Sequence, residues 1–211
     1  MNSIYIHIPF CQSRCIYCDF YSTTYGHNIM ASYVQALIRE MVRRKHYIEC
    51  SRVDTLYIGG GTPSLLPTEL LTTIFDAIRH NFTLTPNAEV TIEANPDDIN
   101  NEWLKNITQT PINRISIGTQ TFDDQILNRI GRRHNAKQTI KAVEACKQAG
   151  ITNISLDLIS SLPGQTMQHW EKDVHTALSL GITHLSAYTL SYEEGTKLHK
   201  MLINGDIKET D

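Results

Sequence analysis

The sequence lacks the features of a membrane-spanning or an exported chain. It contains no run of 18 consecutive apolar residues, which is about the length that a helix needs to cross a bilayer. Its first ten residues, MNSIYIHIPF, contain no basic stretch, no long apolar core and no small-residue cleavage site, so they do not resemble a signal peptide. We therefore expect a cytoplasmic protein.

A strong charge of either sign is also missing. The 19 basic and 22 acidic residues leave a formal net charge of −3, which gives no general attraction to nucleic acid or to an anionic membrane. We accordingly expect no nucleic-acid partner. Hydrophobic residues make up 41% of the chain and charged residues 19%, which are ordinary values for a globular protein. Because no linker or low-complexity tract divides the sequence, we expect residues 1–211 to form one domain.

The cysteines do not suit a disulfide framework, since there are five of them. Disulfides are rare in the cytosol, where clustered cysteines usually bind metal or carry out redox chemistry. Cys50 and Cys146 are isolated in the sequence and are expected to be ordinary buried or half-buried thiols. Cys11, Cys15 and Cys18 instead fall within eight residues, in a C-x3-C-x2-C spacing directly after the apolar run IYIHIPF.

Short β-rich runs alternate with windows of helical periodicity along the chain. In 31–43, apolar residues recur at i, i+3, i+4, i+7 and i+8 from Val34, which places them on one helical face. Gly150 and Gly181 stand where helix C-caps are expected. Strands are expected at 4–8, 55–59, 89–94, 114–118, 153–159 and 184–190. Helices are expected at roughly 31–43, 67–80, 100–109, 122–130, 136–149 and 166–179.

The alternation of six strands with helices predicts an α/β fold with parallel pairing and right-handed crossovers. The spacing suits a full or partial barrel as well as an open doubly wound sheet, and periodicity alone does not separate them. Both architectures place their active sites at the carboxyl ends of the strands. The unusual polar residues of this chain fall at or near those ends.

The cysteine triplet follows the first expected strand. A structural zinc site normally has four protein ligands in two well-separated pairs; no second pair follows here, although zinc with His7 as the fourth ligand stays an alternative. Three unligated, exposed thiols would oxidise readily. Three closely spaced thiolates suit three irons of a [4Fe–4S] cluster and leave the fourth iron open. An open metal position is how a site binds a substrate or a cofactor.

The segment GGGTPS (59–64) follows the second expected strand. Gly60 and Gly61 could form an ordinary glycine turn. They could equally bring backbone N–H groups and Thr62 close to a ligand that carries a carboxylate or an amine. The segment matches neither G-x-G-x-x-G nor a Walker P-loop, so the motif alone leaves both interpretations open.

Four further polar residues accompany the later strands. Glu93 ends the third strand, and Gln120 follows the fourth. Arg132 lies in IGRRHN, and Asp157 lies inside the apolar run ISLDLI. A charged residue in a buried strand needs a partner or a ligand. One interpretation is an internal salt bridge from Arg132 to Glu93 or Asp157; the other is a ligand site in which the fork of Arg132 binds a carboxylate.

The C-x3-C-x2-C spacing, with an aromatic residue before the last cysteine and a βα-repeat chain around it, resembles the radical S-adenosylmethionine (SAM) superfamily. The resemblance implies a partial (β/α)6 barrel that carries a [4Fe–4S] cluster, whose open iron is chelated by the amino and carboxylate groups of SAM. It also implies an electron donor, such as flavodoxin or ferredoxin, if SAM is cleaved to methionine and a 5′-deoxyadenosyl radical.

A closer resemblance comes from six segments together: YIHIPFCQSRCIYCDF, GGGTPS, EANPDD, RISIGTQTF, IGRRHN and DLISSLPGQT. They are similar to the oxygen-independent coproporphyrinogen III oxidase-like family over essentially the whole chain. By this similarity, Cys11, Cys15 and Cys18 hold the cluster. The SAM-binding residues that the resemblance implies are Tyr5, Tyr17, Gly60, Gly61, Thr62, Glu93, Gln120, Arg132 and Asp157.

Two departures favour the haem-chaperone branch of this family. Its oxidases carry a further cysteine two positions after the third, where this chain has Phe20, and a longer segment before the first strand. The branch implies a protein that binds haem and delivers it to membrane respiratory proteins, with peripheral membrane contact. The family's C-terminal domain is expected to be absent from residues 1–211, which then form the radical SAM core domain.

Two other functions and the haem ligand stay open at this point. Oxygen-independent decarboxylation of coproporphyrinogen III propionates is the alternative activity, and a radical SAM RNA-modifying enzyme is disfavoured by the acidic charge balance. The sequence does not choose a haem ligand among its nine histidines. His134 is expected to be a hydrogen-bonding neighbour of the SAM site, and His46 and Cys50 are weaker candidates.

Overall fold

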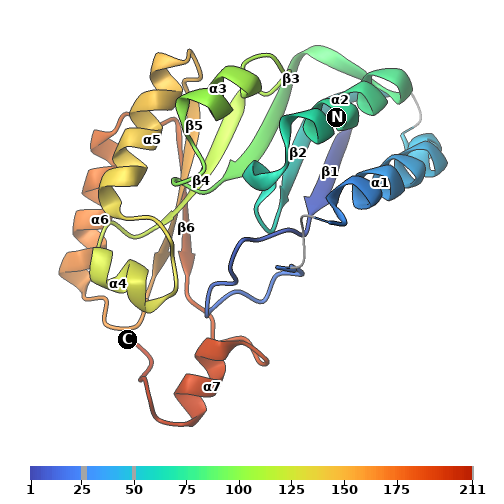
Figure 1. Cartoon of the computed structure of the whole chain (residues 1–211). Coiled ribbons are helices and arrows are strands. Elements are labelled where there is room, and N and C mark those ends of the chain that lie inside the picture. Colours follow the sequence, from blue (N-terminus) through green and yellow to red (C-terminus); the bar gives the residue numbers. More distant parts are fainter. Residues whose placement is uncertain (25–27, 49–50, 211) are drawn as a thin grey trace.

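The computed structural model describes residues 1–24, 28–48 and 51–210. It contains one sheet of six parallel strands whose order follows the chain (Figure 1). The strands are β1 (Ser3–Ile8), β2 (Arg52–Gly60), β3 (Thr83–Ala94), β4 (Arg114–Gln120), β5 (Asn153–Ser160) and β6 (His184–Thr189). The α-helices are α1 (Met30–Arg44), α2 (Thr68–Asn81), α3 (Asn101–Ile107), α4 (Asp124–Arg129), α5 (Ala136–Gln148), α6 (Met167–Ser179) and α7 (Lys197–Ile203). Two 3-10 helices, η1 (Lys45–Tyr47) and η2 (Pro63–Leu65), complete the described elements.

The sheet is curved and open. Strands β1 and β6 form its two edges and do not pair with each other in the described part of the chain. Helices α1 to α6 follow the outer side of the curve in Figure 1, so the architecture is a partial (β/α)6 barrel, as the sequence predicts. None of the described helices is both long and apolar enough to span a membrane.

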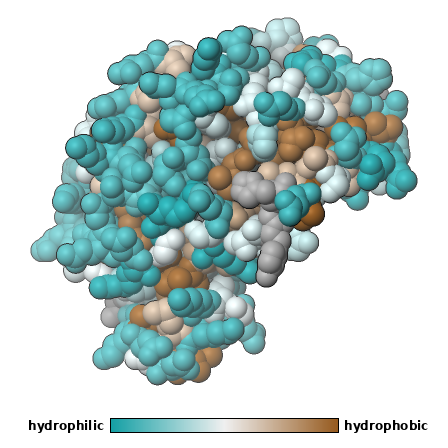
Figure 2. Space-filling view, viewed as in Figure 1, coloured by the Kyte–Doolittle hydropathy of each residue, from teal (hydrophilic) through white to brown (hydrophobic). Residues whose placement is uncertain are grey.

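The outer face of the sheet carries the core. Four isoleucines lie side by side in neighbouring strands, and none is exposed to solvent: Ile58, Ile92, Ile115 and Ile154. Burial of such a side chain contributes about 1.5–3 kcal/mol to the free energy of folding. The packing of this row against the helices therefore stabilises four strands of the sheet. The opposite sides of the helices face water, and the part of the surface formed by α4, α5 and α6 is mostly hydrophilic in Figure 2.

The helix ends follow the expected capping chemistry. Asn135 and Thr166 each form a capping box at the start of α5 and α6. Gly150 and Gly181 follow the same two helices with φ angles of 88° and 59°, a region that suits glycine because it has no Cβ. The predicted helix ends at these glycines are therefore confirmed.

Strands β2 and β3 begin at least three residues before their predicted starts, and the α-helix α7 was not predicted. The added residues at the start of β3, TLTPNA, contain Pro86 and show no apolar alternation, so they carry little strand signal. Their partners are the first residues of β2, beyond an irregularity in the register. Helix α7 is only seven residues long, too short for a clear periodic pattern.

Of the two isolated cysteines, only Cys146 lies within the described residues. Cys146 lies fully buried in α5, where burial raises the pKa of its thiol to about 12, as expected of an ordinary core thiol. Cys50 lies outside the described residues.

The inner face of the sheet is polar. Tyr5, Tyr57, Thr91 and Arg114 lie side by side in β1 to β4, on the opposite face from the isoleucine row. In Figure 1, the described helices α1 to α6 lie on the other side of the sheet from this face.

Candidate functional site

The cysteine loop lies at the carboxyl end of β1. Its start is fixed by two backbone hydrogen bonds, from Thr23 N to Pro9 O (2.7 Å) and from Cys11 N to Thr23 O (2.9 Å). Its middle is fixed from two further segments: Ile16 N donates to Ile130 O (3.3 Å), and Leu198 N at the start of α7 donates to Ile16 O (2.8 Å). Figure 1 shows the loop and α7 at the same end of the sheet.

The three cysteines of this loop are free and half-buried. Cys18 N donates to Cys15 O (3.2 Å), which folds the loop back on itself. Burial raises the pKa of Cys18, and the neighbouring Cys15 and Cys11 add to the increase. Closely spaced thiols are stabilised as thiolates when cations bind them, which fits the predicted cluster ligands.

No three His, Cys, Asp or Glu side chains in the described segments converge tightly enough to hold a single metal ion. In particular, both ring nitrogens of His7 contact other groups, Tyr5 Oη (3.1 Å) and Tyr21 O (2.8 Å). The zinc alternative with His7 therefore has no support. A [4Fe–4S] cluster binds each thiolate to a different iron, so its ligands stand farther apart than those of one ion.

The glycine segment packs directly against this loop. Gly61 N donates to Ile8 O, and Thr62 N donates to Phe10 O, each at 2.8 Å. A Cβ on Gly61 would lie 2.8 Å from Phe10 O and 2.9 Å from Cys11 Sγ, closer than side-chain atoms pack. Gly61 is thus required for the close approach of the two segments, and the interpretation as a simple turn is insufficient.

Arg132 contacts the cysteine loop at Cys15. Its Nη1 donates to Cys15 Sγ (3.5 Å), and its Nη2 donates to Asn95 Oδ1 and to Gly118 O, each at 2.6 Å. Its Nε is buried and has no hydrogen-bond partner among the described residues. A buried donor without a partner is costly, so Nε–H is available for an acceptor on a bound ligand.

Glu93 is held at the end of β3 by two donors. The Tyr57 hydroxyl donates to Oε1 (2.8 Å), and Gly60 N donates to Oε2 (3.0 Å). Burial nevertheless raises the pKa of Glu93, and the charge of Asp157 adds to the increase. A cationic group bound beside this carboxylate would stabilise its ionised form.

Asp157 lies on the same face, one strand beyond Ser116. The Ser116 hydroxyl lies 3.2 Å from Oδ1 and 3.1 Å from Oδ2 of Asp157. Burial raises the pKa of Asp157 as well, while hydrogen bonds from Ser186 and Ser116 lower it. Two half-buried carboxylates with raised pKa values therefore lie on the inner face of the sheet.

The salt bridge that the sequence offered as one interpretation is wrong. In the described part of the chain, Arg132 makes no ion pair with Glu93 or Asp157. Hydroxyl and backbone donors satisfy the two carboxylates, and the guanidinium is held by Asn95 and Gly118. The three charged groups thus remain available to separate parts of a ligand.

Gln120 lies at the end of β4 in a left-handed backbone conformation, with a φ of 66°. The register with β5 is irregular between Gly118 and Gln120. A Cβ on Gly118 would lie 3.0 Å from Gln120 Nε2 and 3.2 Å from Arg132 Nη2. The strained backbone and the adjacent glycine together bring the Gln120 amide beside Arg132.

The two predicted tyrosines lie in different parts of the site. Tyr5 is exposed on the inner face and stacks on Tyr57, with ring centroids 6.0 Å apart. Tyr17 lies within the cysteine loop, where burial is the main cause of a raised pKa and Cys15 and Cys18 contribute. The structure thus brings all the predicted site residues to the inner face and the carboxyl end of the sheet.

The sequence interpretation missed three residues of this site. Asn95 contacts Arg132, Tyr57 contacts Glu93, and Ser116 contacts Asp157. Tyr57 and Ser116 alternate with buried isoleucines in their strands, so their place on the polar face was available from the alternation.

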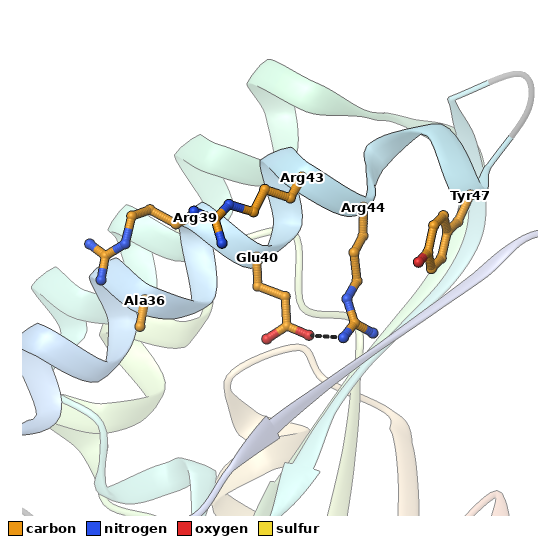
Figure 3. Close-up of a pocket in the computed structure, with 6 residues that line it drawn as sticks. All are labelled: Ala36, Arg39, Glu40, Arg43, Arg44 and Tyr47. Atoms are coloured by element: carbon orange, nitrogen blue, oxygen red, sulfur yellow. Dashed lines mark ion pairs between the residues drawn. The ribbon is translucent and has the colours of Figure 1, made fainter.

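Two surface grooves of about 590 Å³ each lie away from these residues. One lies along the end of α1, where Arg44 Nη2 pairs with Glu40 Oε1 at 3.1 Å (Figure 3). The other contains Met1 and Glu89, near the amino ends of the strands. Neither groove contains a predicted site residue, so we assign the site to the inner face and the cysteine loop.

His134 is buried close to Arg132. Its Nε2 lies 3.1 Å from Thr119 O and donates to it, and its Nδ1 is buried without a partner among the described residues. Burial, together with the charge of Arg132, lowers the pKa of His134 to about 3. A neutral, buried imidazole agrees with its predicted role as a hydrogen-bonding neighbour.

We expect His134 to make folding sensitive to acid. Its pKa is about 3 in the folded protein against 6.5 for an ordinary histidine, so between these values the unfolded chain binds more protons. Stability should therefore fall as the pH falls from 6.5 towards 3, with a contribution of up to about 1.4 kcal/mol per pH unit. Urea unfolding at a series of pH values should show a flatter decline for His134→Gln. The exposed His80→Gln is the matched control, and equal slopes in all three proteins would refute this role.

The fold and the site define a class of protein. An open parallel α/β barrel with three free cysteines at the end of its first strand, and glycine and carboxylate groups at the next two, is typical of radical SAM proteins. The sequence model of the radical SAM superfamily matches residues 5–177. The chain belongs to this superfamily.

Curated relatives of the chain carry a more specific name than the superfamily, heme chaperone HemW. The chain is 40% identical over 208 residues to heme chaperone HemW of Bacillus subtilis, covering 97% of this chain and 54% of that protein. It is 41% identical over 195 residues to HemW of Lactococcus lactis, covering 92% and 50%. The chain thus spans about half the length of the curated relatives it matches.

A solved structure is similar over nearly the same range. Coproporphyrinogen III oxidase (HemN) of Escherichia coli, described as a radical SAM enzyme, superposes with a TM-score of 0.88 at 25% identity. The match covers 98% of this chain and 48% of that chain. The predicted fold class and the predicted family are both confirmed.

Proposed function

We propose that this chain is the cluster- and SAM-binding core of a haem chaperone that transfers haem to respiratory proteins. The observation that carries the proposal is the 40% identity to HemW along 97% of the chain, against 25% identity to the oxidase HemN. Phe20 supports the same choice, because it stands where oxidases of the family are expected to carry a further cysteine. The proposed setting is the cytoplasm, with peripheral contact to the membrane at delivery.

The proposed cofactor site consists of the residues at the strand ends. Cys11, Cys15 and Cys18 would each bind one iron of a [4Fe–4S] cluster, and SAM at the open iron would supply reductive cleavage of a carbon–sulfur bond. That reduction needs a one-electron donor of the flavodoxin or ferredoxin type. The three free thiols and their hydrogen-bond donors fit the cluster, since each accepts a donor without being blocked by a disulfide.

The remaining predicted residues would bind SAM itself. Arg132 would donate its unpaired Nε–H to the carboxylate. Glu93 and Asp157, whose pKa values are raised mainly by burial, would accept from the amino group and the ribose hydroxyls. The set that would line the ligand is completed by Tyr5, Tyr17, Gly60, Gly61, Thr62 and Gln120.

Paired assays on the anaerobically reconstituted protein test the function. We expect haem to bind, with a shifted Soret band, and to pass to a haem-free respiratory acceptor protein. We expect no release of CO2 from coproporphyrinogen III in the presence of SAM and a reductant, under conditions in which an oxidase of the family is active. Decarboxylation with multiple turnovers would replace the chaperone by the oxidase.

A further inference from the structure

Asn95 connects two of the predicted cluster ligands through hydrogen bonds. Its Nδ2 donates to Thr62 Oγ1 (3.5 Å), and Thr62 Oγ1 donates to Cys11 Sγ (3.5 Å). Its Oδ1 accepts from Arg132 Nη2 (2.6 Å), and Arg132 Nη1 donates to Cys15 Sγ (3.5 Å). One amide side chain therefore contacts two of the donors that reach the cysteine sulfurs.

The backbone of Asn95 is itself held firmly. Asn95 N donates to Ser64 Oγ (3.3 Å), and Ser64 Oγ donates to Asp98 Oδ2 (2.6 Å). Asp98 in turn pairs with Arg133 Nη2 (3.1 Å). Pro96 follows directly, and a residue before proline is restricted to extended conformations. The backbone of Asn95 is thus held by a hydrogen bond at its own N–H and by the conformational restriction that Pro96 imposes. A residue that positions other side chains needs a backbone fixed in this way.

We propose that Asn95 is a positioning residue of the iron–sulfur site, which holds Thr62 and Arg132 on Cys11 and Cys15 and thereby raises the reduction potential of the cluster. The inference rests on the cluster-binding part of the proposed function. Cys18 differs from the other two ligands, because its contact is a backbone hydrogen bond from Phe20. Asn95 therefore acts on two of the three thiolates through side chains that a mutation can remove.

The sign of the expected change in midpoint potential follows from the negative charge that the cluster gains on reduction. Reduction adds one electron to the cluster, and hydrogen bonds to its thiolates stabilise that added negative charge. Arg132 brings a full positive charge as well as a donor. Loss of Asn95 removes one contact that holds each of these two donors on its sulfur, so the donors are less well placed and the reduced state loses more stabilisation than the oxidised state. The midpoint potential then moves to a more negative value.

Redox titration of the reconstituted protein, followed by the EPR signal of the reduced cluster, measures this effect. We expect a more negative midpoint potential in Asn95→Ala and in Asn95→Leu, which fills the amide volume without either hydrogen bond. Thr62→Val should shift the potential in the same direction. Adding Asn95→Ala to Thr62→Val should produce a smaller further shift than Asn95→Ala alone, because the two residues act in one chain.

Asn113→Ala is the matched control. The Asn113 side chain makes two hydrogen bonds as well, but with the backbone of β3: its Oδ1 accepts from Val90 N (2.9 Å) and its Nδ2 donates to Ala88 O (2.8 Å). Asn113 lies directly before β4. Its replacement should leave the potential unchanged. An unchanged potential in both Asn95 variants at full iron content would overturn the inference, as would loss of iron from both. Absence of a cluster from the unaltered protein would instead overturn the proposed function.

Discussion

Replacing Cys15 with alanine is expected to abolish the iron–sulfur cluster. A [4Fe–4S] cluster contributes about four irons per chain, and with only two cysteine ligands left it has two open irons instead of one. Arg132 would also lose the sulfur that its Nη1 contacts at 3.5 Å. We expect iron content after anaerobic reconstitution to fall to nearly zero, together with the brown absorbance of the cluster.

Cys146→Ala is the matched control for this experiment. Cys146 is a fully buried thiol in α5, far along the chain from the loop. Its replacement removes one buried sulfur, at a cost to stability of about 1 kcal/mol, and should leave the iron content unchanged. Full iron content in Cys15→Ala would refute the assignment of the cluster ligands.

Replacing Arg132 with alanine is expected to weaken SAM binding most among the non-cysteine residues of the site. Removing one partner of a buried, hydrogen-bonded charge pair costs about 2 kcal/mol or more, which corresponds to about 30-fold in affinity. The loss also leaves Asn95 Oδ1 and Gly118 O without the donor that they share at 2.6 Å. Equilibrium binding of SAM to the reconstituted protein, by ultrafiltration or calorimetry, measures the change.

The neighbouring variant Arg133→Ala tests whether the position of the Arg132 guanidinium, rather than the positive charge of this segment alone, governs SAM binding. Arg133 pairs with Asp97 Oδ2 (3.0 Å) and Asp98 Oδ1 (3.1 Å), so it carries the same charge on the same segment but points to other partners. Its replacement should leave the affinity for SAM within a few-fold of the original. Equal losses in the two variants would mean that net charge, rather than the fork of Arg132, governs binding.

Much of the fold was predictable because its signals are local. Each strand alternates with an amphipathic helix, and Gly150 and Gly181 mark helix ends by their freedom to adopt positive φ. The start of β3 was not predictable in the same way, since TLTPNA pairs with β2 without an apolar alternation of its own. Such a segment becomes a strand only because its partner lies beside it.

In the candidate site, too, local features were predictable from the sequence and long-range contacts were not. The cysteine spacing identifies a cluster loop within eight residues of sequence, because its ligands must come from one short segment. Arg132 was singled out by its motif, yet the salt bridge to Glu93 or Asp157, one of the two interpretations of that motif, does not form among the described residues. Asn95, which it does contact, lies 37 positions away in sequence, and no local pattern predicts a hydrogen bond over such a separation.

The sequence by itself determined the alternating elements, the cluster loop and the superfamily, because periodicity, caps and ligand spacing act over a few residues. Only the tertiary structure decided which strand ends meet. Parallel pairing in chain order brings the cysteine loop, Gly61, Asn95 and Arg132 to one end of the sheet. Hydrogen-bond partners there depend on the register between strands and on the course of the connecting loops, which are global properties of the packed chain.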